Sequence, residues 1–160
     1  MTNNKRQSGI TTVEFAIVAA VLITVILAVI DISRLYFSVA ALNEATRRGA
    51  RVAAVCPVDD GAIAQIAVFN VSGEEGPSPI VGGLETQHID VKYLDEDGAP
   101  VVDPGGAGFR SISYVRVRIN GFQLRTFIPG LPQFISVPDF AATLPRESLG
   151  IPREGVIVPC

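Results

Sequence analysis

The stretch that decides the fold is GITTVEFAIVAAVLITVILAVI, residues 9–30. Residues 15–30 carry no charge, and Thr24 supplies their only hydroxyl group. As a helix, residues 13–30 would be about 27 Å long at about 1.5 Å per residue, close to the hydrocarbon thickness of a bilayer. The stretch therefore predicts one membrane-spanning helix over residues 13–30.

The composition is typical of a membrane-anchored chain with one small domain. The chain has 160 residues and a mean hydropathy of +0.39, and most of its apolar excess lies in residues 9–30. The formal net charge is −3 and the basic residues form no long run, which argues against nucleic-acid binding. Cys56 and Cys160 are compatible with one disulfide if the domain lies in an oxidising compartment. They do not make a metal site, and we expect no cofactor.

The helical pattern continues beyond the apolar stretch. Apolar or small side chains recur at three- and four-residue spacing at Ile32, Leu35, Val39, Leu42 and Ala45. Pro57 cannot easily extend the helix, and the residue before it is biased away from helix. We therefore predict one helix over residues 10–56, about 45 residues and about 70 Å long. An ordinary secretory signal is disfavoured, because Asp31 and Arg34 follow the apolar stretch where a small-residue cleavage site would stand.

Residues 57–160 predict a small α+β domain. Asp59 or Asp60 is placed to cap a short helix that runs through Phe69. Alternating apolar and polar residues predict strands over residues 88–94, 112–122, 124–128 and 136–144, with a bend at Gly121. Pro138 interrupts the last strand, which places it at an edge or a bulge. The predicted fold class is α+β, with a long transmembrane-plus-amphipathic N-terminal helix packed on a small C-terminal antiparallel sheet.

Three segments together resemble one known family. The sequence KRQSG followed by ITTVEF resembles a type IV pilin-like signal, and a glutamate followed by an aromatic residue, here Glu14 and Phe15, is typical of the Flp/Tad branch. The segment LYFSVAALNEATRRGARVAA resembles the helix extension of TadE-like minor pseudopilins, and RTFIPGLPQFISVPDFAATLPRES resembles the ending of that family. The chain thus resembles a TadE-like minor pseudopilin of the Flp/Tad (type IVc) pilus over nearly its whole length. Residues 73–108 and the tail beyond Glu147 depart from that pattern.

The resemblance implies a pilin-like fold and a processing site. Residues 1–9 would form a leader that a prepilin peptidase removes between Gly9 and Ile10. The new amine on Ile10 is cationic, and Glu14 of one subunit would face the amine of its neighbour, which offsets the cost of desolvating both charges. Close packing of such helices is favoured by the small residues Ala16, Ala19, Ala20 and Ala28.

The resemblance also implies partners and a location. The partners would be a prepilin peptidase, a sister pseudopilin, the major pilin, the inner-membrane assembly platform and membrane lipid, with no nucleic acid and no small-molecule substrate. The protein would be no enzyme, and would act in assembly or initiation of a tight-adherence pilus used in cell adhesion. The flanking charges do not fix the orientation. The short leader and the two cysteines favour a cytoplasmic N-terminus and a periplasmic domain in a bacterial inner membrane, or in the pilus. The alternative is an uncleaved single-pass anchor that presents an extracytoplasmic binding domain.

Other constellations favour structural roles. His88, the only histidine, lies on a predicted strand without a nucleophile partner. The acids that could bind calcium lack the spacing of a calcium loop and indicate a solvated turn; they are Asp95, Glu96, Asp97 and Asp103. A solvated helix face is the expected place of Arg47, Arg48 and Arg51.

Overall fold

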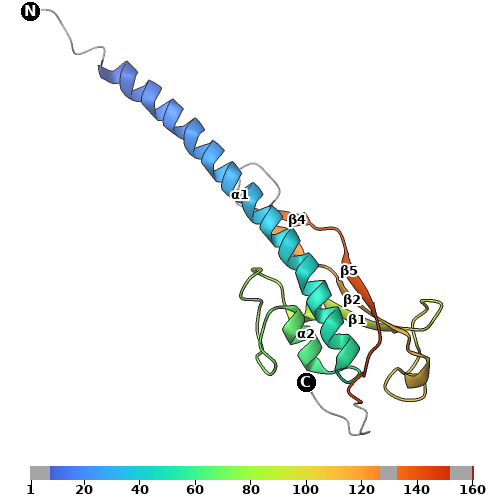
Figure 1. Ribbon diagram of the computed structural model, residues 1–160. Helices are drawn as coiled ribbons and strands as arrows, with labels where there is room; N and C mark the ends of the chain where they lie inside the picture. The colour runs from blue at the N-terminus through green and yellow to red at the C-terminus, as the bar shows by residue number, and fades with distance from the viewer. Residues whose placement is uncertain (1–7, 127–132, 152–159) are drawn as a thin grey trace, which may run out of the picture.

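The predicted α+β layout is confirmed in the computed structural model, which describes residues 8–126, 133–151 and 160, with side chains from residue 11 onward. Helix α1 (Ser8–Val55) is the long axis of the molecule, and the other elements gather around its C-terminal half (Figure 1). Its N-terminal half projects alone, and apolar side chains there are exposed, including Phe15 at 74% and Val21 at 61%. The helix is long and apolar enough to cross a membrane.

The second half of α1 is amphipathic, as its sequence pattern predicts. Leu42 and Ala45 are fully buried against the domain, Leu35 and Val39 are half-buried, and Ile32 remains 51% exposed. Burial of this apolar stripe is therefore complete only in the last four turns of the helix. There α1 contacts α2 (Gly61–Ala67), β2 (Tyr114–Ile119) and β5 (Phe140–Pro145).

Helix α2 (Gly61–Ala67) follows the turn that ends α1. Of the two predicted capping residues, Asp60 takes the role: its carboxylate accepts a hydrogen bond from the Ala62 N–H at 2.9 Å. The helix is shorter than predicted, because Phe69 lies beyond its end with a positive φ of 69°. That conformation cannot extend a right-handed helix.

Three strands form an antiparallel sheet with the order β1-β2-β5, namely β1 (Ile89–Leu94), β2 (Tyr114–Ile119) and β5 (Phe140–Pro145). In β2 the alternation predicts the faces correctly: Val115 and Val117 are buried against α1, and Arg116 faces solvent. The prediction that His88 belongs to β1 is wrong, because His88 ends the 3-10 helix η1 (Thr86–His88) and β1 begins one residue later. A second such turn, η2 (Phe109–Ser111), precedes β2.

A second, two-stranded sheet pairs β3 (Gln123–Arg125) with β4 (Phe134–Ser136). The prediction of one strand over residues 136–144 is wrong, because β4 ends before Pro138 and β5 begins after it in the other sheet. Proline has no N–H for a strand ladder, so the chain changes sheets there. The bend at Gly121 (φ +68°) separates β2 from β3. Residues 127 and 128 of the predicted third strand lie outside the described residues.

Small side chains on α1 let the domain approach it closely. Gly49 shows this most clearly, since a Cβ atom there would lie 2.9 Å from the Ala67 Cβ and 3.1 Å from the Val117 Cγ1. Beside it, Ala50 and Ala53 are also fully buried. Helix α1 therefore acts as the central wall of the core, with α2 and the three-stranded sheet packed against it.

Candidate functional site

The predicted processing site lies at the exposed end of α1. Gly9 and Ile10 occupy the first turn of the helix, which begins at Ser8. Glu14 and Phe15 follow one turn later, and both side chains are exposed. The structure thus places the four residues together on one projecting helix, away from the folded domain. Cleavage after Gly9 and the pairing of Glu14 with an amine stay predictions.

Glu14 stands at one end of an otherwise uncharged helix. Within the described part of the chain, no residue forms an ion pair with its carboxylate. An ionised carboxylate at bilayer depth costs on the order of 3 kcal/mol, and less near the interface. A cation supplied by another chain would lower that cost.

A charged cluster marks the opposite end of the apolar stretch. Asp31 is only 9% exposed, and its Oδ1 lies 3.8 Å from Nη1 of Arg34, whose side chain is 56% exposed. Both residues line a cavity of about 160 Å³ between α1 and the β3–β4 pair. Sequence reasoning missed this cluster. An acid and an arginine three residues apart, directly after an apolar stretch, were the available signal.

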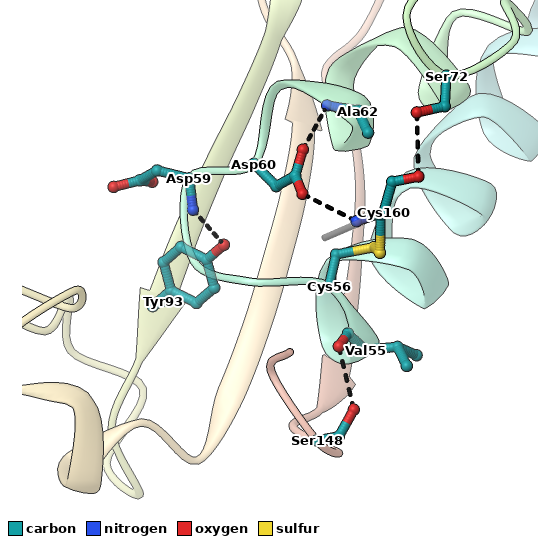
Figure 2. Close-up of a disulfide and its surroundings, with 9 residues drawn as sticks. All are labelled: Val55, Cys56, Asp59, Asp60, Ala62, Ser72, Tyr93, Ser148 and Cys160. Carbon is teal, nitrogen blue, oxygen red and sulfur yellow. Dashed lines mark hydrogen bonds between the residues drawn. A yellow bond between two sulfur atoms is a disulfide. The ribbon is translucent and has the colours of Figure 1, made fainter. Parts of the chain in front are cut away.

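The C-terminal residue is joined to the end of α1. Cys56 and Cys160 form a disulfide with their Cα atoms 5.8 Å apart (Figure 2). The Cys160 N–H donates to Oδ2 of Asp60 at 3.2 Å, and the Ser72 Oγ donates to the Cys160 carbonyl at 3.1 Å. Asp60 therefore caps α2 with one oxygen and holds the last residue with the other.

Residues 147–150 cap the C-terminal end of α1. The last carbonyls of a helix have no partner within the helix. Here the Ala54 carbonyl accepts from the N–H groups of Glu147 and Leu149, at 3.0 and 3.3 Å. The Val55 carbonyl accepts from the Gly150 N–H at 2.6 Å. It also accepts from the Ser148 Oγ at 3.0 Å, as Figure 2 shows. Residues 147–150 therefore satisfy the carbonyl groups of the last two residues of α1.

A buried tyrosine braces the turn between α1 and α2. The Asp59 N–H donates to the Tyr93 hydroxyl oxygen at 3.2 Å (Figure 2), and only 3% of Tyr93 is exposed. Burial raises the pKa of the Tyr93 phenol above its ordinary value of 10.0 because the charged form would be desolvated. The hydrogen bond from Asp59 opposes that rise, and the negative charges of Asp59 and Asp60 add to it.

The remaining polar candidates have local structural roles. His88 Nδ1 accepts from the Glu85 N–H at 3.0 Å, and its ring meets the edge of Phe122 at a centroid distance of 5.6 Å. Asp95 Oδ1 accepts from the N–H groups of Asp97 and Ala99, which closes the turn before Pro100. These groups are therefore engaged in turns and caps.

The predicted solvated face of α1 is exposed. Arg47, Arg48 and Arg51 all lie on the surface, and the Arg48 guanidinium stacks over the Phe69 ring at 5.7 Å from its centroid.

A hollow of about 670 Å³ lies between α2 and residues 75–86. Its polar side chains include Gln65 and Glu85. The Gln65 Oε1 accepts from the Gly73 N–H at 2.7 Å, and the Glu85 carboxylate accepts from the Gln87 amide at 2.9 Å. The lining of this hollow also includes Glu75 and Thr86, and neither histidine nor cysteine is among the described residues that line it.

Fold and site together define a class: a single-pass membrane-anchored protein whose one apolar helix carries a small α+β domain. Residues 9–51 match the family model described as TadE-like protein. The resemblance to TadE-like proteins is thereby confirmed for α1, and it associates the chain with the Tad pilus system. The match ends at Arg51, so the resemblance of the C-terminal segment stays a prediction. No curated protein and no solved structure matches the chain.

Proposed function

We propose that this protein is a TadE-like minor pseudopilin that a prepilin peptidase cleaves after Gly9, and that it acts in the assembly or initiation of a Flp-type pilus. The observation that carries the proposal is the match of residues 9–51 to TadE-like proteins on a helix whose apolar half is exposed. A helix of this kind needs lipid or other helices around it. Its role is structural rather than catalytic.

The chemistry of the helix end supports a role in assembly. Cleavage after Gly9 leaves a cationic amine on Ile10, one turn before the exposed Glu14. In a helical assembly, the Glu14 carboxylate of one subunit would pair with the amine of its neighbour. Two charges that are each costly in lipid then offset one another. The partners are a sister pseudopilin, the major pilin and the membrane assembly platform.

The disulfide supports an extracytoplasmic domain. Structural disulfides persist in oxidising compartments such as the bacterial periplasm. The Cys56–Cys160 bond therefore favours a periplasmic domain, and with a single span over residues 13–30 it places the N-terminus in the cytoplasm. That orientation also leaves Gly9 at the cytoplasmic end of the span, where the leader would be removed.

The decisive experiment is the intact mass of the protein purified from its native membranes. A chain that begins at Ile10 supports processing, and Gly9→Val should then retain the leader because a β-branched side chain obstructs the cleavage site. A chain that begins at Met1 or Thr2 would overturn the pseudopilin proposal. It would favour an uncleaved anchor that presents a binding domain.

Amine pairing has its own test. Glu14→Ala should leave cleavage largely intact and lower the number of pili, because the amine of a neighbour loses its counter-charge. Glu44→Ala is the matched control, since Glu44 is an exposed acid on the same helix beyond the membrane span. Normal piliation in the Glu14→Ala strain would contradict the pairing role.

A further inference from the structure

We propose that the cavity between α1 and the β3–β4 pair binds the phosphate of an anionic phospholipid headgroup, in the leaflet on the side of the domain. This inference rests on the proposed membrane insertion of residues 13–30. It assigns a ligand to the cluster around Asp31 and Arg34, which processing and amine pairing do not use.

The depth of the cavity fits the lipid headgroups. Arg34 lies four residues beyond Ile30, or about 6 Å along the helix axis. The headgroup layer of each leaflet is about 5–8 Å thick. The same part of α1 exposes Tyr36 at 73%, and tyrosine is enriched at the membrane–water interface. The mouth of the cavity therefore lies at the level of the lipid phosphates.

The chemistry of the cavity walls suits a phosphate group. Arg34 comes from α1 and Arg125 from β3, and both side chains are exposed at the cavity. Guanidinium groups bind phosphate oxygens with paired N–H donors. The hydroxyl-bearing residues Ser38 and Thr126 stand beside them in the lining. The apolar part of the wall is suited to the start of an acyl chain and consists of Ile32, Leu35, Leu124 and Ile135.

The charge and the size of the cavity also match a phosphodiester group. Two arginines and one aspartate leave the cavity with one net positive charge, which matches the single negative charge of a phosphodiester. The buried Asp31 lies beside Arg34, and its negative charge offsets one of the two guanidinium charges at the cavity. A volume of about 160 Å³ accommodates a headgroup phosphate rather than a folded segment, and the rest of the lipid stays in the leaflet.

The test measures lipid affinity of the full-length protein in neutral detergent micelles by native mass spectrometry, with phosphatidylglycerol and phosphatidylcholine as probes. We expect phosphatidylglycerol to bind about tenfold more tightly, and Arg125→Gln to remove about that factor, as for the loss of a charge-assisted hydrogen bond. Arg116→Gln is the matched control, because it removes the same charge from the solvent face of β2. Equal affinity for the two lipids, or an equal loss in both variants, would overturn the proposal.

Two further arms separate the possible explanations. Asp31→Asn removes the negative charge among the lining residues of the cavity, so phosphatidylglycerol should bind about threefold more tightly. Unchanged or weaker binding would contradict the assignment. Damage to the fold would not produce this gain in affinity. Inorganic phosphate at millimolar concentration should not displace the lipid; full displacement would show a site for free phosphate instead. If the chain begins at Ile10 but shows no preference for phosphatidylglycerol, only the lipid-binding inference is overturned. If the chain keeps its leader but prefers phosphatidylglycerol, only cleavage after Gly9 is overturned.

Discussion

Replacing Gly49 by alanine should weaken the docking of α2 and β2 on α1. An added Cβ would lie 2.9 Å from the Ala67 Cβ and 3.1 Å from the Val117 Cγ1. Both neighbours are fully buried, so neither can move into open space. One of them is part of a helix and the other of a central strand, and the contact must be relieved by shifting whole elements.

Two opposing effects decide whether Gly49→Ala raises or lowers the free energy of unfolding. Alanine in place of glycine inside a helix gains about 1 kcal/mol of helix propensity. Overpacking a close-packed core costs about 1–3 kcal/mol. We therefore expect Gly49→Ala to lower the free energy of unfolding by about 1 kcal/mol, and Gly49→Val, which adds two further methyl groups in the same place, to lower it by more.

The assay is urea unfolding of the full chain in detergent micelles, followed by circular dichroism. Gly61→Ala is the matched control, because Gly61 begins α2 and a Cβ atom there would meet nothing within 4 Å. This control should be neutral or about 0.4–1 kcal/mol more stable than the wild type. A Gly49→Ala chain that gains the same stability as the control would refute the close-contact reasoning.

The disulfide and the buried tyrosine give two more predictions. Replacing Cys56 and Cys160 by serine should lower the free energy of unfolding by about 2–4 kcal/mol; thermal unfolding with and without reductant checks this, and equal midpoints would contradict it. The pKa of Tyr93 is raised above 10.0 in the folded protein. Its contribution to the free energy of unfolding is therefore fully present below about pH 10 and is lost as the pH rises through the folded-state pKa. Tyr93→Phe should cost about 1 kcal/mol at pH 7 and reduce the alkaline loss of stability in pH-dependent unfolding; an unchanged alkaline loss would exclude Tyr93 as its source.

Local patterns in the sequence determined the elements of this protein. The apolar stretch and its amphipathic extension predict α1, and Pro57 predicts its end to within two residues. Alternation predicts β1 and β2 because each of these strands buries one face. The TadE-like resemblance also rests on α1, where the family match lies. In each case the signal and the structure occupy the same short segment of chain.

Contacts between distant segments were decided only by the tertiary structure. No periodicity indicates that residues 147–150 cap α1, that Asp31 is buried beside a cavity, or that Gly49 must lack a side chain. Pro138 indicated an interruption of the strand. The two strands that it separates belong to different sheets, because β4 pairs with β3 and β5 pairs with β2. Strand pairing, helix capping and burial depend on contacts with segments that are distant in the sequence. These roles of individual residues therefore arise only when the domain packs against α1.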